Sequence, residues 1–494
     1  MKNNMTRFYI AMDYGGTSGR AILGRYDGRV LKLQEILRFP NYFTEINGIC
    51  YWDSLMMYHK LKEAVLTAKR ICDGEEPVSI GIDGWGTDYG FLDRSGNPNG
   101  YAVCERNTMG IGRREVQRLI GAKQLYHRTG IHSLNGNTIF QLYERKMRKD
   151  TAMQAAGTLL LLPDLLGYFL TGKKVSEYSN AATTMILDVE TSQWNLDIIR
   201  QLELPDDIFP SVIMAGEYVY SLQQSVRKEL NVRDMKYVPV LTHDTASAIA
   251  AIRYQLGVAF CSSGTWSIMG MVSEELLVND TAMKYNFCSS RFGEKQYKIH
   301  RDFMGMWMIS KCREEWHQQG KLLEWDDITA AAAEAEAFTT FVDVDELQFF
   351  NTGNMLEKIA DYCRRTKQPV PQSIGAVSRC VYESIALRYR RTFEELQEIA
   401  GTELTALHIV GGGSRNHLMN QFVADAIGKP VIAGLTEAAC TGNLLIQMMA
   451  DEQIHRLEEG WDIVDASFES DIFEPINTEK WDDFYSYYKY VIQK

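Results

Sequence analysis

Two segments far apart in the chain repeat one pattern, in which a strand ends in small polar residues and the next strand leaves at once. The first is DYGGTSGRAILG, from Asp13 to Gly24, and the second is SSGTWSIMG, from Ser262 to Gly270. We interpret the pair as a weak internal duplication. Because 494 residues also exceed the size at which a single hydrophobic core stops growing, the sequence predicts two domains.

The rest of the chain alternates predicted strands with predicted helices. Strands are expected at 7–13, 19–26, 29–39, 78–85, 237–242, 256–264, 265–273, 404–413 and 429–434, and helices from Ser54 and at 244–251, 373–400, 416–427 and 437–450. Residues 121–230 are mostly helical patterns and look like an insertion on the first domain. The pattern predicts an α/β fold, divided into domains at 1–246 and 247–494.

Composition excludes several classes of partner. A formal net charge of −12 argues against a nucleic-acid surface, which needs clustered Lys and Arg. The nine cysteines show neither disulfide nor zinc spacing. The apolar run at 8–12 is too short for a secretory signal, and the run at 159–170 is broken by Pro163 and Asp164. We therefore expect a cytoplasmic protein that binds neither nucleic acid nor membrane.

The two repeated turns are candidate phosphate sites. In Asp13–Arg20, two glycines permit the positive φ of an anion-binding nest, and two hydroxyls can add donors. Ser262–Thr265 offers similar donors, and two such turns facing each other across a cleft would enclose a polyphosphate. The alternative is a pair of plain hairpin turns.

The run Val410–Gly413 ends a strand and precedes a helix, where a nucleotide can approach backbone, although this signal alone is weak.

Asp244 is the candidate catalytic base. It follows a predicted strand, and a carboxylate there could accept the proton of a substrate hydroxyl during phosphoryl transfer. The alternative is that Asp244 caps the following helix. His243 is interpreted as an orienting neighbour.

The segment Asp83–Asp88 combines carboxylates, glycines and an indole that suit a polyol, or else forms a glycine-rich bend with a core Trp.

These motifs, in this order and at these distances, resemble the FGGY family of carbohydrate kinases over nearly the whole chain, and most closely its branch that acts on 6-deoxyketohexoses. The resemblance implies two actin-like, ribonuclease H-like domains with a catalytic cleft between them, the first binding sugar and the second ATP. It implies that Asp244 is the base and that Asp13 lies near Mg²⁺. The implied nucleotide contacts are Gly16, Thr17, Ser18, Gly19, Arg20, Thr265 and Gly412, and the implied sugar contacts are Gly86, His243, Thr245 and the position of Asp302.

Two positions depart from that branch. Asp302 stands where its members carry Asn, a sugar contact, and Ser310 stands where they carry Gln, a nucleotide contact. A stretch Asn-Glu-Gly-Gly expected near 286–292 is also missing. The expected reaction is phosphorylation of the 1-hydroxyl of L-rhamnulose or its C4 epimer L-fuculose, by a monomer or homodimer. The rival interpretations are a kinase of glycerol or a pentulose, and an actin-like ATPase or sugar-sensing protein.

Overall fold

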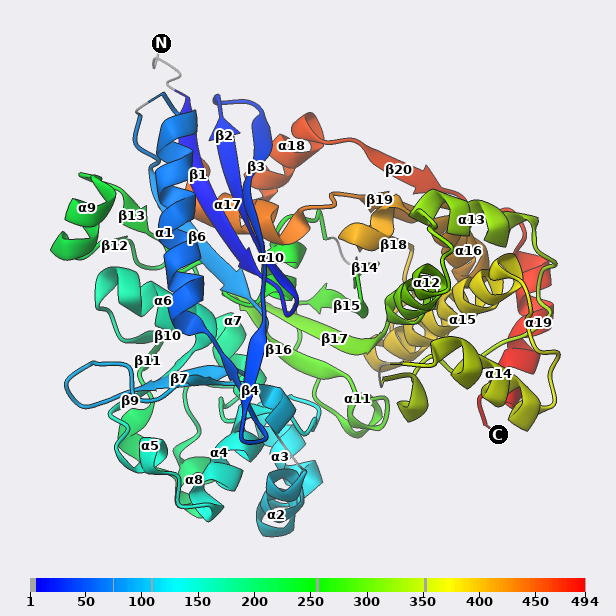
Figure 1. The fold of residues 1–494 in the computed structure, drawn as a ribbon, viewed down its shortest axis with the longest axis horizontal. Coiled ribbons are helices and arrows are strands. Elements are labelled where there is room, and N and C mark those ends of the chain that lie inside the picture. Colours follow the sequence, from blue (N-terminus) through cyan, green and yellow to red (C-terminus); the bar gives the residue numbers. More distant parts are fainter. Residues whose placement is uncertain (1–5, 74, 108–109, 255–256, 351–352, 494) are drawn as a thin grey trace. The chain divides into compact units, whose positions relative to one another are not determined.

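The computed structural model describes residues 6–73, 75–107, 110–254, 257–350 and 353–493. The chain forms two compact units (Figure 1). Unit 1 contains Met1–Arg253, Glu274–Lys298 and Ala438–Phe468, and unit 2 contains Tyr254–Ser273, Ile299–Glu437 and Glu469–Lys494. The sequence predicted a single division near residue 246, whereas unit 1 also takes up two later segments.

The main sheet of unit 1 has the strand order β12-β13-β6-β1-β2-β3. β1 (Arg7–Tyr14), β2 (Ser18–Tyr26) and β3 (Leu31–Pro40) form the antiparallel meander expected from the sequence. β6 (Ser79–Gly84) lies parallel to β1, and β13 (Lys236–Tyr237) lies parallel to β6. β12 (Tyr220–Ser221) closes the order antiparallel to β13.

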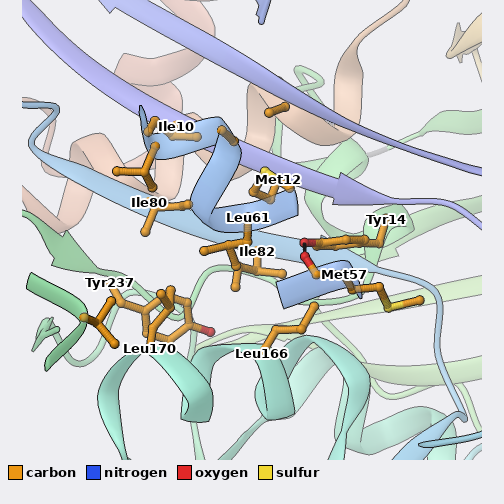
Figure 2. Packing of buried hydrophobic residues seen from close by; sticks show 14 of the residues in the cluster. Ile10, Met12, Tyr14, Met57, Leu61, Ile80, Ile82, Leu166, Leu170 and Tyr237 are labelled. Atoms are coloured by element: carbon orange, nitrogen blue, oxygen red, sulfur yellow. Dashed lines mark hydrogen bonds between the residues drawn. The ribbon is translucent and has the colours of Figure 1, made fainter. Parts of the chain in front are cut away.

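One face of this sheet forms the main hydrophobic core of unit 1. Side chains alternate between the faces of a strand, so Ile80 and Ile82 of β6 point to the same side as Met12 of β1. They pack against α1 (Ser54–Ile71) and α6 (Leu162–Thr171), as Figure 2 shows. α1 begins where the sequence predicts, because the Asp53 carboxylate accepts the backbone N–H of Met56.

The opposite face is covered by α17 (Ala438–Ala450), which itself packs on α10 (Asp244–Ala250). Ser79 and Asp83, which alternate with the core isoleucines, hydrogen-bond to side chains of α17. α10 and α17 approach so closely that a Cβ at Gly442 would collide with the carbonyl oxygen of Ser247. In Figure 1, α17, drawn in orange, lies beside the blue β1 although the two are far apart in sequence.

The strand predicted at 237–242 is mostly irregular, and of its residues only Tyr237 belongs to β13. Its backbone still follows β6: Val238 N–H donates to the Ile80 carbonyl, and Gly84 N–H donates to the Thr242 carbonyl. A bridge between Gly84 and His243 ends this pairing. The segment therefore delivers Asp244 to the same edge of the sheet as Asp83.

The predicted helical insertion contains short strands as well as helices, around a second core. β7 (Tyr89–Leu92) pairs with β9 (Thr158–Leu161), and β10 (Val175–Glu177) pairs with β11 (Ser211–Ile213). The remaining elements of unit 1 are β4 (Phe43–Ile46), β5 (Ile49–Trp52), β8 (Ala102–Val103), α2 (Ile111–Ile120), α3 (Ala122–Thr129), α4 (Thr138–Met147), α5 (Thr151–Gln154), α7 (Tyr178–Ala181), α8 (Leu196–Gln201), α9 (Gln224–Leu230), α11 (Asp280–Lys284), β16 (Cys288–Gly293) and α18 (Leu457–Ser467).

Unit 2 has the sheet order β17-β15-β14-β18-β19-β20. β14 (Val258–Ser263) pairs antiparallel with β15 (Trp266–Ser273) and parallel with β18 (Ala406–Val410), which pairs parallel with β19 (Val431–Gly434). β20 (Ser470–Phe473) is antiparallel to β19, and β17 (Gln296–Met304) begins within unit 1. This repeats the order β3-β2-β1-β6-β13-β12 of unit 1, as the duplication predicts. Leu256, the first residue of a predicted strand, lies outside the described residues.

The helices of unit 2 follow the predicted boundaries closely. α15 (Ile374–Ala400) starts after Ser373, whose hydroxyl accepts the Ala376 N–H, and α16 (His417–Ile427) starts after Asn416 in the same way. The other helices are α12 (Trp307–Gln318), α13 (Trp325–Glu334), α14 (Met355–Thr366) and α19 (Thr478–Val491). Within the described parts of the chain, none of the helices has the length and apolar character to cross a bilayer.

Candidate active site

Three carboxylates gather at one edge of the unit 1 sheet. Asp13 and Asp83 are paired in register on the parallel strands β1 and β6, and Asp244 follows the segment that runs beside β6. Ligands of open α/β sheets bind at the carboxyl ends of such strands. Burial, and after it the negative charge of Asp13, raises the pKa of both Asp83 and Asp244.

Asp244 is the first residue of α10, and its side chain is 34% exposed. The backbone N–H and the hydroxyl of Thr245 both donate to its Oδ1, at 2.5 and 3.1 Å. Burial, reinforced by Asp13, raises the pKa of Asp244 to about 7 against these hydrogen bonds. A pKa near the working pH suits a general base. The alternative role of helix cap falls to His243, whose Nδ1 accepts the Thr245 N–H at 3.2 Å.

Asp13 is buried and paired with Arg20. The guanidinium Nη2 lies 2.6 Å from Asp13 Oδ2, and Nε donates to the same oxygen at 3.0 Å. This pair crosses from β1 to β2, where the two residues are opposite each other. Arg20 therefore offsets the negative charge of Asp13 at this edge.

The turn between β1 and β2 has a conformation that differs from the prediction. Neither Gly15 nor Gly16 has positive φ, so the expected positive-φ nest is wrong for these residues. A Cβ at Gly15 would lie 2.9 Å from the Ser18 carbonyl oxygen, and one at Gly19 would collide with the Phe39 ring. At Gly16 it would meet no atom within 4 Å. Gly16 and Thr17 are exposed, so backbone at this turn is open to a ligand.

The carboxylates of Asp83 and Asp88 bind protein groups rather than facing solvent. Asn443 of α17 donates to Asp83 Oδ2 at 2.6 Å, while Oδ1 of Asp83 accepts no hydrogen bond. The indole N–H groups of Trp52 and Trp85 both donate to Asp88 Oδ2, at 2.6 and 2.9 Å. The segment is therefore a bend braced by two tryptophans, and both of its carboxylates are buried.

The predicted sugar contacts of unit 1 lie near Asp244 in different environments. Gly86 is half-buried, and a Cβ there would lie 2.7 Å from the Thr183 side chain. Thr245 is buried, and its hydroxyl donates to Asp244. Burial and the charge of Lys298 lower the pKa of His243 well below its ordinary value, which keeps its imidazole neutral. Direct contact of these residues with a sugar stays a prediction.

In unit 2, Thr265 and Gly412 lie at the ends of neighbouring strands. Ser262 of β14 is paired with Val410 of β18, so the turns that follow meet at one edge of the sheet. Gly413 packs against Ser263 too closely for a side chain. The Ser263 side chain is buried, and its hydroxyl accepts a hydrogen bond from Tyr389 at 3.0 Å.

Gly412 differs from its neighbours in this turn. Gly411 has φ +82°, a conformation that favours glycine, and Gly413 has no room for a Cβ. A Cβ at Gly412 would meet no atom within 4 Å. Because Thr265 is also exposed, this edge leaves backbone accessible to a ligand.

Asp302 and Ser310 also belong to unit 2. Asp302 is exposed on β17, and the neighbouring Arg301 is bound to Glu395 at 3.1 Å and to Asp345 at 3.4 Å. The Ser310 hydroxyl donates to the Met306 carbonyl one helical turn back.

Three residues near Asp244 were missed by sequence reasoning: Glu177, Lys298 and Asn443. Asn443 and Gln447 are polar at i, i+4 on an otherwise apolar helix, a signal that could have been found. Gln447 donates to Asn443 Oδ1 at 2.7 Å and accepts from Ser79, so a buried polar chain runs along α17. Nothing in the sequence singles out Glu177 or Lys298.

Fold and site together fit a phosphoryl-transfer enzyme: two α/β units of matching sheet order, glycine turns open at strand ends and a half-buried carboxylate with a raised pKa. The chain belongs to the FGGY family of carbohydrate kinases. The model of the family's N-terminal domain matches residues 8–251, and that of its C-terminal domain matches 259–450. It is therefore a phosphotransferase that acts on a sugar hydroxyl, as the motifs predicted.

Its curated relatives include rhamnulokinases. That of Bacteroides thetaiotaomicron is 35% identical over 489 residues, covering 98% of this chain and 99% of the relative, and that of Bacillus subtilis is 32% identical, covering 96% of each. Among solved structures, gluconate kinase from Lactobacillus acidophilus has a TM-score of 0.82 at 15% identity, covering 99% of this chain and 98% of that one. Plasmodium falciparum glycerol kinase with ADP has a TM-score of 0.81 at 15% identity, also covering 99% of this chain and 98% of that one. These structures confirm the predicted fold.

Proposed function

We propose that this chain transfers the γ-phosphoryl group of ATP to the 1-hydroxyl of L-rhamnulose. The oxygen of that hydroxyl forms the new bond to phosphorus, the bond to the β–γ bridging oxygen breaks, and ADP leaves. Asp244 takes the hydroxyl proton. The observation that carries the mechanism is the half-buried Asp244 carboxylate with its pKa raised to about 7. The full-length rhamnulokinase relatives support the choice of sugar.

In this proposal the first domain, 1–246, holds the sugar and the second, 247–494, holds most of the nucleotide. Gly86, His243 and Thr245 would contact the sugar. Thr265 and Gly412 would contact the nucleotide, and the turn Gly16–Arg20 would contact its phosphates. The open space at Gly16 and Gly412 supports this assignment, because glycine there meets no steric need within the protein.

The carboxylate edge of unit 1 also fits a magnesium ion. Burial and the charge of Asp13 raise the pKa of Asp83 and of Asp244, and Asp83 Oδ1 is buried without a hydrogen-bond donor, so added positive charge would be favourable. No group of three His, Cys, Asp or Glu side chains suited to a metal occurs among the described residues. This agrees with Mg²⁺ held by one or two carboxylates and by substrate phosphates. We assign Asp13 to it; when bound, the ion would neutralise phosphate charge.

The first test is the substitution Asp244→Asn, which removes the proton acceptor while keeping the shape of the side chain. We expect kcat with L-rhamnulose to fall by about 10²-fold or more with ATP binding retained. ADP release is measured with Mg·ATP and a panel of L-rhamnulose, L-fuculose, D-xylulose and glycerol. An enzyme that releases ADP equally without sugar would be an ATPase.

Asp280→Asn is the matched control. Asp280 is likewise the first residue of a helix in unit 1, but it is paired with Lys123 and His127 at the surface. Its substitution should leave kcat within about twofold. If Asp244→Asn behaved like this control, Asp244 would not be the base.

A further inference from the structure

The two residues that precede Asp244 are held by a short segment from the insertion. Glu177 ends β10, and Ser179 and Asn180 follow it in α7. All three side chains are buried. None belongs to the motifs that identify the family resemblance, and none is assigned a role by the proposed mechanism.

Glu177 binds Thr242 through a single carboxylate oxygen. Its Oε2 accepts the backbone N–H and the hydroxyl of Thr242, both at 2.9 Å, and the hydroxyl of Ser179 at 2.5 Å. Burial raises the pKa of Glu177, and the hydrogen bonds donated by Ser179 and Thr242 oppose that rise. Thr242 therefore has little freedom to move relative to β10.

Ser179 and Asn180 complete the hold on this backbone. The Ser179 hydroxyl accepts the His243 N–H at 3.1 Å, and the Asn180 amide donates to the carbonyls of Thr242 and Trp85, each at 3.3 Å. The same segment thus contacts the backbone on both sides of the bridge between Gly84 and His243. It fixes the start of α10 relative to the end of β6.

We propose that Glu177, with Ser179 and Asn180, is a positioning residue that sets the direction of the Asp244 carboxylate. The proposal rests on the role of Asp244 as base. Proton transfer requires the base within hydrogen-bond reach of the substrate hydroxyl, and a displacement of about 1 Å costs on the order of 10²-fold in rate. The Glu177 side chain accepts hydrogen bonds from Ser179 and Thr242, and neither residue is a predicted sugar or nucleotide contact.

The test compares Glu177→Gln with Asp164→Asn. Gln keeps the size of the side chain but removes the carboxylate, so only one of its two terminal atoms can still accept hydrogen bonds. Asp164 is also a buried carboxylate of this network, accepting the Glu177 N–H at 3.2 Å, but it does not contact residues 242–243. We expect Glu177→Gln to lower kcat at least tenfold with the KM for ATP unchanged, and Asp164→Asn to keep kcat within about twofold. Glu177→Asp, which retains charge but is shorter, should also lower kcat.

The decisive readout is the double variant Glu177→Gln with Asp244→Asn. If Glu177 acts by placing the base, its substitution should lower kcat by no more than twofold once the base is absent. A loss of the same size in both backgrounds, or wild-type kcat in folded Glu177→Gln, would overturn the proposal. Should Glu177→Gln fail to fold by circular dichroism, Ser179→Ala replaces it in the same cycle. If Asp244→Asn alone kept full activity, both the role of Asp244 as base and the positioning role of Glu177 would be refuted. If Asp244→Asn lost activity while Glu177→Gln kept the wild-type kcat, only the positioning role would be refuted.

Discussion

At the residue scale, the glycine run of unit 2 contains one position that the fold does not need. Gly411 requires positive φ and Gly413 has no room beside Ser263, but Gly412 faces open space. A larger side chain at Gly412 should therefore leave the stability of the protein unchanged and affect only the binding of a ligand. Few positions separate these two effects so clearly.

We accordingly expect Gly412→Val to raise the KM for ATP by about tenfold or more while the KM for sugar changes little. Gly413→Val is the contrast, because its side chain would collide with Ser263 and should lower the melting temperature. Steady-state kinetics and calorimetry on both variants check the pair. An unchanged ATP KM in folded Gly412→Val would place the nucleotide elsewhere.

Asp302 carries the prediction about sugar choice. Asn both donates and accepts hydrogen bonds, whereas an ionised Asp only accepts, so the pattern offered to a sugar hydroxyl has changed. A site built for one C4 epimer penalises the other by about 1–3 kcal/mol when a buried polar group is left unpaired. We expect Asp302→Asn to shift the ratio of kcat/KM toward L-rhamnulose over L-fuculose.

The exposure of Asp302 supplies the competing explanation. If the Asp302 carboxylate points into solvent or pairs with Arg301, the ratio of the two sugars would stay unchanged. The pairing of Arg301 with Glu395 and Asp345 gives that residue partners of its own. Measuring both sugars with wild type and variant separates the two interpretations.

Site residues could be predicted where they stand in short motifs at strand ends. Asp244 and Gly412 follow runs of strand formers, so local sequence reveals them. Glu177 and Lys298 could not be predicted, because each is a lone residue brought to the site by an element whose partner lies far along the chain. The conformation of the turn at Gly15 and Gly16 was also beyond local reasoning, since glycine permits positive φ without requiring it.

At the scale of elements, the meander β1-β2-β3 and the long helix α15 were predictable from alternation and capping. The segment 237–242 has the sequence of a strand, yet only Tyr237 of these residues belongs to β13. The sequence predicts α17 as a helix, but not that it packs on the sheet of unit 1. Pattern determines the type of an element far better than its partner.

The contact between α17 and α10 gives a stability prediction. A methyl group at Gly442 would meet the backbone carbonyl of Ser247, which cannot move as a side chain can. We expect Gly442→Ala to destabilise the protein by about 1–3 kcal/mol or more despite the better helix propensity of Ala. Gly460→Ala in α18 is the matched control, because the closest atoms there are side-chain methyls of Leu445 and Ile454 at 3.0–3.2 Å. Urea unfolding of both variants checks the difference, and equal midpoints would contradict it.

At the scale of the whole molecule, the proposed phosphate contacts belong to two different units. A single nucleotide held by both should bring them together, as closure does in many kinases. We expect sugar and nucleotide together to reduce the radius of gyration more than either ligand alone, measured by small-angle scattering on the Asp244→Asn variant to prevent turnover. Identical radii with and without both ligands would count against mobile units.

Unit 1 has its sheet near the start of the chain but the cover of that sheet, α17, near residue 440. During synthesis on the ribosome, the sheet face with Ser79, Gly81 and Asp83 stays uncovered until α17 has been made. The roughly 180 residues between Arg253 and α17 take about 10–40 s at ~5–20 residues per second. During that interval the nascent chain exposes unpaired polar groups and an open sheet face, the condition in which chaperones are recruited. A fragment that stops at Arg253 would lack α17 and would leave this face of the sheet uncovered.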